Sequence, residues 1–357
     1  MRLEEQVLET LTGLCGVSAG TGIAAAISGG PDSMALLHLL AAARKPLQLR
    51  LTAVWIDHGL RPQETPQEKA TVAAAAVKLG IPCITRQADV AALATAEGLS
   101  LEHAARELRY NLLGETADEC GAEWIAVGHT ADDQAEEVLL RLLRGSGRKG
   151  LAGMQLRSGN LIRPLLRTSK QELVAWLNER GLAFCYDSSN NDRRFLRNRV
   201  RHELLPFLEE RFEPGIKKAL LKTADSLAAD EQLLEELTDK AFQETVRKAV
   251  GQSGLPIMRL LRQPFLALPA ALQRRVLEQL LWRMASRAAY EHILLLMQAA
   301  KNGRTGSELH LSQGLRVGVG RAGLEFFYPA GRRSWRGRLN PRQAGVDHAP
   351  AAHQIPD

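Results

Sequence analysis

The sequence lacks the features that mark several common protein classes. Its four cysteines are far apart in the chain and form neither a CxxC metal motif nor an iron–sulfur ligand pattern: Cys15, Cys83, Cys120 and Cys185. No apolar run approaches the roughly 18 residues that a membrane-spanning helix needs. The first residues are acidic and amphipathic, unlike a signal peptide. We therefore expect a cytoplasmic protein without a membrane segment or an iron–sulfur cluster.

The net charge of +6 over 357 residues is unevenly distributed. Residues 1–150 carry a net charge of −5, whereas residues 151–357 carry +11. Such a division indicates a polyanionic partner that is held mainly by the second part of the chain. Solubility alone would also explain a mild basic excess, so charge is weak support when taken by itself.

The first half of the chain alternates between short apolar runs and amphipathic segments, as expected for an α/β fold with a doubly wound parallel sheet. Strands are predicted at residues 23–28, 49–57, 81–86 and 124–128, and helices at 32–43, 66–79, 100–119 and 131–144. Residues 145–150 (GSGRKG) look like a flexible linker.

The second half is mainly helical, with predicted helices at 169–180, between 199 and about 249, and between 264 and 300. Pro206 and Pro214 are expected to break the helices. Short strands are predicted between residues 309 and 328. The sequence therefore predicts three parts: an α/β domain of residues 1–205, a smaller helix-rich domain of residues 206–328 and a basic flexible tail of residues 329–357.

A glycine-rich hexapeptide lies between the first predicted strand and its helix: Ser28, Gly29, Gly30, Pro31, Asp32 and Ser33. The glycines let the backbone approach a phosphate closely, and the helix start supplies N–H donors. A carboxylate beside phosphates needs a bridging cation, so we expect Asp32 to hold Mg²⁺. Such residues also form simple turns. Because no Gly-Lys-Ser/Thr ending is present, a kinase-like transfer of the terminal phosphate is disfavoured.

The order Ser-Gly-Gly-x-Asp-Ser after a first strand resembles the fingerprint of the N-type ATP pyrophosphatases, or PP-loop enzymes. This resemblance implies an adenine nucleotide hydrolase-like fold and cleavage of ATP to AMP and pyrophosphate, with adenylation of a substrate oxygen. It also assigns the hexapeptide to ATP binding. The superfamily includes amidating synthetases, tRNA thiolases and tRNA(Ile)-lysidine synthases.

Further segments, in order between residues 22 and 202, are similar to the tRNA(Ile)-lysidine synthase family: IDHGLR (56–61), EHAARELRY (102–110), GHTADDQAE (128–136), RPLL (163–166) and DSSN (187–190). The resemblance implies ligation of free L-lysine to the wobble cytidine of the tRNA(Ile) with a CAU anticodon, through an adenylated cytosine. ATP and Mg²⁺ would be the cofactors. Residues 1–205 would then be catalytic, and residues 206–328 would recognise the tRNA.

Within these segments, Arg109 is a candidate ligand of the ATP phosphates, although two arginines on one helix face can also form a solvated stripe. The candidate catalytic or lysine-binding residues are His129, Asp132, Asp133 and Glu136. Acidic residues in a first helical turn also favour the helix dipole. Glu137 departs from the family, which commonly has Thr at this position.

Five arginines with no acidic residue among them follow the DSSN segment: Arg193, Arg194, Arg197, Arg199 and Arg201. A solvated helix face normally mixes both signs, so this run is predicted to bind the tRNA backbone. The runner-up functions are a tRNA cytidine thiolase, which the scattered cysteines disfavour, and a small-molecule amidating synthetase, which the arginine run disfavours. A noncatalytic RNA-binding protein is a further alternative.

Overall fold

The computed structural model describes residues 2–59, 63, 65–186, 196–251 and 256–329. The chain divides into two compact units, Met1–Ala228 and Ala229–Asp357. The division falls within helix α11 (Ile216–Thr245). The predicted domain limits at residues 205 and 328 remain predictions, and residues 330–357 of the predicted tail lie outside the described residues.

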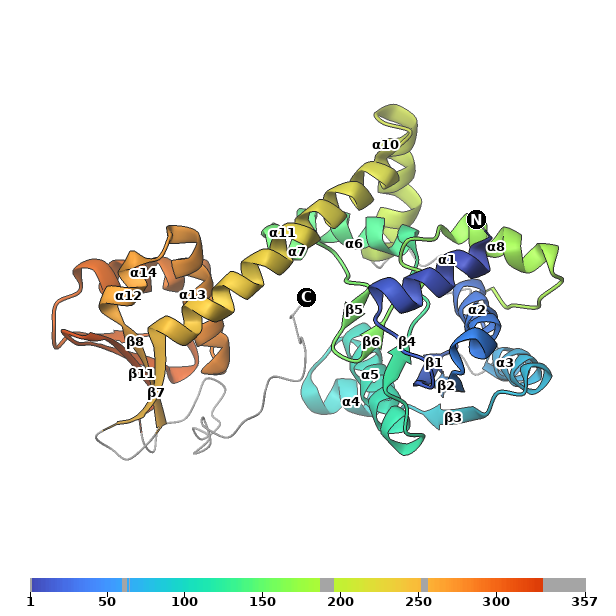
Figure 1. The fold of residues 1–357 in the computed structure, drawn as a ribbon, viewed down its shortest axis with the longest axis horizontal. Coiled ribbons are helices and arrows are strands. Elements are labelled where there is room, and N and C mark those ends of the chain that lie inside the picture. The colour runs from blue at the N-terminus through green and yellow to red at the C-terminus, as the bar shows by residue number, and fades with distance from the viewer. Residues whose placement is uncertain (1, 60–62, 64, 187–195, 252–255, 330–357) are drawn as a thin grey trace. The chain divides into compact units, whose positions relative to one another are not determined.

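The first unit contains a six-stranded sheet in the order β3-β2-β1-β4-β6-β5 (Figure 1). Its strands are β1 (Gly22–Ala26), β2 (Arg50–Asp57), β3 (Cys83–Gln87), β4 (Trp124–Ala126), β5 (Arg157–Ser158) and β6 (Leu161–Ile162). Neighbouring strands are parallel except for the β5–β6 hairpin. The predicted doubly wound parallel sheet is thus confirmed, with the short hairpin as an unpredicted addition.

Helices cover both faces of this sheet. The helices of the first unit are α1 (Leu3–Glu9), α2 (Pro31–Leu47), α3 (Thr65–Leu79), α4 (Val90–Glu97), α5 (Leu101–Glu119), α6 (Ala131–Leu143), α7 (Arg148–Leu151), α8 (Lys170–Glu179), α9 (Leu196–Arg199) and α10 (Leu205–Arg211), with π-helical turns at Thr10–Leu14 and Val200–Leu204. Ile23 and Ala25 of β1 belong to the core on the α2 side, whereas Ala24 and Ala26 pack with Leu113 of α5. This two-sided burial explains why β1 is an uninterrupted apolar run.

Two predictions about chain breaks were wrong. Residues 145–150 lead into the helical turn α7, and Arg141 of α6 donates to the carbonyl oxygens of Gly150 (3.0 Å) and Gly153 (3.4 Å). The segment is therefore anchored to α6 rather than being a linker. Pro206 lies in the first turn of α10, and the helical backbone continues into that turn from the π-helical turn Val200–Leu204.

The second unit combines the end of α11 with three further helices and an antiparallel sheet in the order β7-β8-β11-β10-β9. Its elements are β7 (Val246–Val250), β8 (Pro256–Leu261), α12 (Arg262–Ala267), α13 (Ala270–Arg283), α14 (Tyr290–Asn302), β9 (Glu308–His310), a 3₁₀ turn (Ser312–Gly314), β10 (Arg316–Val319) and β11 (Gly323–Phe327). The helix-rich character is confirmed, but residues 246–249 were wrongly assigned to a helix. No helix within the described residues is long and apolar enough to cross a membrane.

Candidate functional site

The loop between β1 and α2 presents backbone donors at the edge of the sheet where β1 ends. Gly30 is the N-cap of α2 and has no side chain with which to cap the helix. Pro31 follows at the helix start, and its fixed φ suits that position. The first-turn N–H groups therefore have no capping side chain, and they are suited to an anion.

Serine side chains hold the loop in its turned shape. Ser33 Oγ donates to the carbonyl oxygen of Gly30 (3.0 Å) and accepts from the N–H of Ser28 (3.1 Å). The hydroxyl oxygens of Ser28 and Ser33 lie 3.2 Å apart. Gly29 has a φ of +95°, a conformation that strongly favours glycine. The conformation of the loop is therefore set by its own serines and glycine.

Gly128, directly after β4, lies against the start of α2. A Cβ atom at this position would lie 3.0 Å from the carbonyl oxygen of Asp32 and 3.2 Å from the nitrogen of Ser33. Because β1 and β4 are adjacent parallel strands, their carboxyl ends bring two loops together. The predicted ATP loop and the predicted 129–136 segment therefore share one site.

Asp32 is the acidic residue of the loop, and its two carboxylate oxygens differ in their contacts. Its Oδ2 lies 3.3 Å from Lys170 Nζ, whereas its buried Oδ1 has no hydrogen-bond partner within the described residues. Burial raises the pKa of Asp32, and the Lys170 ammonium opposes that shift. Among the described residues, no three His, Cys, Asp or Glu side chains are grouped as metal ligands. Nucleotide-bound Mg²⁺ needs only one or two protein carboxylates, so Asp32 fits that role.

Asp133 shapes the N-terminus of α6. Its Oδ2 accepts hydrogen bonds from the N–H (2.9 Å) and hydroxyl (2.8 Å) of Thr130, which is the N-cap. Burial would raise the pKa of Asp133, but the Arg197 guanidinium and the Thr130 N–H outweigh burial and lower it. Asp133 is therefore ionised at neutral pH.

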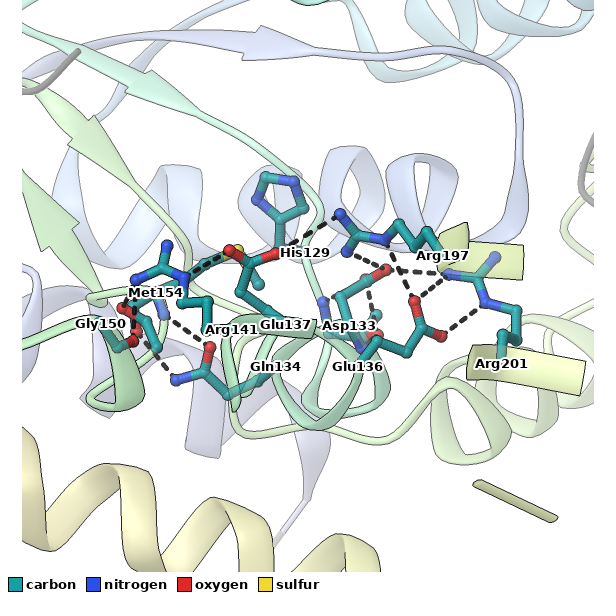
Figure 2. Close-up of polar contacts among 12 residues, drawn as sticks. His129, Asp133, Gln134, Glu136, Glu137, Arg141, Gly150, Met154, Arg197 and Arg201 are labelled. Carbon is teal, nitrogen blue, oxygen red and sulfur yellow. Dashed lines mark hydrogen bonds and ion pairs between the residues drawn. The ribbon is translucent and has the colours of Figure 1, made fainter. Parts of the chain in front are cut away.

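Glu136, one turn along α6, is buried between two guanidinium groups (Figure 2). Arg201 donates to Glu136 through Nε (2.5 Å) and Nη2 (2.9 Å), and Arg197 Nε donates to Glu136 Oε2 (3.2 Å). Both arginines also contact Asp133 Oδ1, at 3.2 Å from Arg201 and 3.4 Å from Arg197. In this structure Arg197 and Arg201 bind carboxylates, an arrangement that does not favour their predicted role at the tRNA backbone.

Glu137, the departure from the family pattern, has a structural role beside Glu136 on the same helix. Its carboxylate accepts from Arg141 Nε (2.6 Å) and lies 3.8 Å from Arg197 Nη1. Figure 2 shows Arg141 directed from Glu137 toward Gly150. The added charge of Glu137 is thus neutralised within the site.

His129 is a neutral acceptor in this structure. Burial lowers its pKa to about 3, despite the nearby carboxylate of Asp133. Its Nδ1 accepts a hydrogen bond from Arg163 Nε (3.2 Å), and Arg163 is itself buried and donates to the Gln155 carbonyl oxygen (2.8 Å). Because Nδ1 is occupied, His129 is not placed to remove a proton through that atom.

Arg109 lies on α5, on the opposite face of the sheet from α2. Burial lowers its pKa, but a guanidinium remains charged at neutral pH. No carboxylate within the described parts of the chain lies within ion-pair distance of Arg109. The Asp133 carboxylate is among the charges that act on it, so Arg109 belongs to the same electrostatic environment as the start of α6. Arg106 stacks on Tyr110, with 5.3 Å between its guanidinium carbon and the ring centroid.

Asp132 meets two residues that the sequence did not identify, Lys170 and Lys217. Its Oδ2 accepts from the backbone N–H of Lys170 (2.7 Å), and its Oδ1 lies 3.3 Å from Lys217 Nζ. A cavity of about 90 Å³ lies between the two loops. Its lining residues are Asp32, Thr130, Asp132, Asp133, Glu136, Lys170, Arg201, Leu205 and Lys217.

Of the other three arginines in the predicted tRNA-binding run, the structure describes one. Arg199 is exposed, with 59% of its side chain accessible and a 3.9 Å contact to Glu203. Arg193 and Arg194 lie outside the described residues, as does the DSSN segment. Of the three arginines of this run that the structure describes, Arg199 is the one that faces solvent.

With the glycine-rich loop and its neighbouring strands in place, comparison with known families is decisive. A family model for the PP-loop domain matches residues 3–208. The chain belongs to the PP-loop family. PP-loop domains bind ATP, which agrees with the uncapped helix start after β1. The matched residues contain the loop, α6 and the arginines that contact it.

Individual relatives are similar over most of this chain. The tRNA(Ile)-lysidine synthase of Geobacillus kaustophilus is 36% identical over 84% of this chain and 65% of its own length. That of Geobacter sulfurreducens is 37% identical over 84% of this chain and 63% of its own length. The chain thus spans slightly less than two thirds of these curated relatives.

A solved structure supports the fold alone. The U34-tRNA thiolase NcsA from Methanococcus maripaludis, solved with its [4Fe-4S] cluster, superposes with a TM-score of 0.51 at 18% identity. The match covers 63% of this chain and 78% of the thiolase. At this identity, the likeness supports a shared architecture and carries no statement about sulfur chemistry.

Proposed function

We propose that this PP-loop protein joins free L-lysine to the wobble cytidine of the tRNA(Ile) with a CAU anticodon, forming lysidine and releasing AMP and pyrophosphate. The observation that carries the proposal is the 36% identity, over 84% of the chain, to a tRNA(Ile)-lysidine synthase. The site is consistent with it, because an anion-binding loop lies beside a cluster of paired charges.

The first step is adenylation of the cytosine. The oxygen at ring position two attacks the α-phosphorus of ATP, and the bond from that phosphorus to the bridging oxygen breaks. The loop N–H groups and Arg109 stabilise the charge that moves onto pyrophosphate. Asp32 would hold Mg²⁺, which supplies further neutralisation of the phosphates. Gly29 and Gly30 allow the close approach that this requires.

The second step needs lysine, whose two amines and one carboxylate require partners of both signs. Asp133 and Glu136 alternate with Arg197 and Arg201 at contact distances. Such a cluster can exchange internal partners for those of a zwitterion without leaving a buried charge unpaired. We assign lysine binding to this cluster.

Asp132 is the carboxylate that best suits the lysine ε-amine. Its ionic partner is the ammonium of Lys217 at 3.3 Å, with 37% of that lysine's side chain exposed, so a substrate ammonium can replace it. Within hydrogen-bond reach, the carboxylate can then take the proton that the amine must lose. The free amine attacks the activated cytosine carbon, and AMP leaves with the former oxygen of that carbon.

The test is incorporation of [¹⁴C]lysine into RNA with ATP, Mg²⁺ and tRNA(Ile) transcripts. The matched control is the same transcript with the wobble cytidine replaced by uridine. Label that depends on ATP and on the cytidine supports the proposal. Activity on a small acceptor without tRNA would support an amidating synthetase instead, and ATP-dependent sulfur incorporation would support a thiolase.

A further inference from the structure

The loop after β1 has no lysine of its own, yet the structure brings one to it from a distant segment. Lys170 is the first residue of α8, which packs against α2. Its Nζ lies 3.3 Å from Asp32 Oδ2, inside the loop. About 40% of the Lys170 side chain is exposed, and the residue lines the cavity beside the loop.

Three cations of the described part of the chain line that cavity, and they differ in the number of acidic partners that hold them. Arg201 forms hydrogen bonds to Glu136 and Asp133. Lys217 lies 3.3 Å from Asp132 and 3.5 Å from Glu209. Among the described residues, Asp32 is the only acid within ion-pair distance of the Lys170 ammonium. Of these cations, Lys170 is therefore the one whose acidic partner lies in the loop.

The backbone of Lys170 is fixed while its ammonium can move. Its N–H donates to Asp132 Oδ2 at 2.7 Å, and Ser169 caps the helix by accepting from the N–H of Glu172. The side chain beyond Cα is a flexible four-carbon stem that carries a compact charge. Lys170 can thus redirect its charge within the site without moving α8.

We propose that Lys170 is a phosphate-binding residue that supplies the cation missing from the loop. Lys170 contacts Asp32 through Oδ2 alone, so its ammonium can turn from that carboxylate to an anion bound at the loop, while Oδ1 would remain for a cation. That anion is the β- and γ-phosphate end of ATP. This inference rests on the proposed function and deepens its first step.

Lys170 takes part in that step as a charge and a hydrogen-bond donor. As the cytosine oxygen bonds to the α-phosphorus, the bond to the bridging oxygen breaks and its electron pair leaves on pyrophosphate. The Lys170 ammonium donates to the pyrophosphate oxygens and keeps its proton. Charge-assisted hydrogen bonds of this kind strengthen as negative charge accumulates on the acceptor.

The test is equilibrium binding of inorganic pyrophosphate and of ATP, each with Mg²⁺, by calorimetry on the full chain. We expect Lys170→Met to weaken pyrophosphate binding at least about tenfold, as loss of a charge-assisted hydrogen bond implies. Lys170→Arg should remain within about threefold of the parent, because the charge is kept. The matched control is Lys45→Met, because Lys45 is exposed at the far end of α2.

A different result is expected if Lys170 does not bind phosphate. If Lys170 only neutralises Asp32, Lys170→Met will bind pyrophosphate as tightly as the parent and will need less Mg²⁺ for half-saturation. That outcome overturns the inference. Because the assay uses no tRNA or lysine, it stands apart from the proposed function, which fails if the parent protein binds ATP but does not label tRNA with lysine.

Discussion

Replacing Glu136 by Gln removes the carboxylate that holds two guanidinium groups inside the first unit. The Glu136 side chain is only 2% exposed, and it accepts from Arg201 at 2.5 Å and 2.9 Å and from Arg197 at 3.2 Å. Its removal leaves both arginines with Asp133 as their nearest acid, while Glu137 lies 3.8 Å from Arg197. The pairing of charges in the site is then broken.

The expected cost follows from this burial. Removing one partner of a buried ion pair costs about 3–5 kcal/mol. The lower end applies here, because the two arginine side chains are 28% and 24% exposed and keep a second acid. We therefore expect Glu136→Gln to lower the free energy of unfolding by about 3 kcal/mol. For a unit of this size, that corresponds to a Tm about 6–12 °C lower.

Urea unfolding at neutral pH, followed by tryptophan fluorescence, measures this loss. The control is Glu123→Gln, which removes an exposed ion pair with Arg50 (3.2 Å; side chains 58% and 61% exposed) and should cost less than about 1 kcal/mol. If Glu136→Gln is no more destabilising than Glu123→Gln, the buried cluster does not exist in solution as described.

Three further predictions concern single residues of the site. Because its neighbours hold the pKa of Asp133 low, the ionised carboxylate stabilises the fold fully above its ordinary pKa of about 4, and this contribution is lost as pH falls through the lower pKa of the folded state. Asp133→Asn should therefore flatten the fall of the urea midpoint below about pH 4. An unchanged slope of midpoint against pH would contradict this. Asp32→Ala should reduce Mg²⁺-dependent pyrophosphate release at least about a hundredfold while filter binding of tRNA is retained; normal release with weakened tRNA binding would show that its role is different. Arg199→Ala should weaken tRNA binding and reduce the slope of log affinity against log salt by about one, and a slope equal to that of the parent would argue against a phosphate contact.

The fold of the first unit was predictable because its signals are local. Apolar runs such as Ile23–Ile27 are long enough to identify a strand that is buried on both faces. Adjacent parallel strands then place the Ser28–Ser33 loop beside the 129–136 segment. Strands β7 and β8 were missed, because their signal lies in pairing with each other and with β11 rather than in their own composition.

The partners within the site were less predictable. A run of arginines does not reveal which of them face solvent, and the charge count alone predicted one role for all five. Arg197 and Arg201 are four residues apart, a spacing that on a helix favours a shared face, while Arg199 lies between them in the sequence. Lys170 and Lys217 lie in segments without a motif, so only the folded chain brings them to Asp32 and Asp132.

The most direct test of the proposed activity is the chemical identity of nucleotide 34 after reaction. The CAU-anticodon tRNA(Ile) is incubated with the protein, ATP, Mg²⁺ and lysine, digested to nucleosides and analysed by mass spectrometry. We predict a cytidine that has gained lysine with loss of water, and only when both ATP and lysine are present. An unmodified cytidine, or one that carries sulfur, would contradict the proposed function.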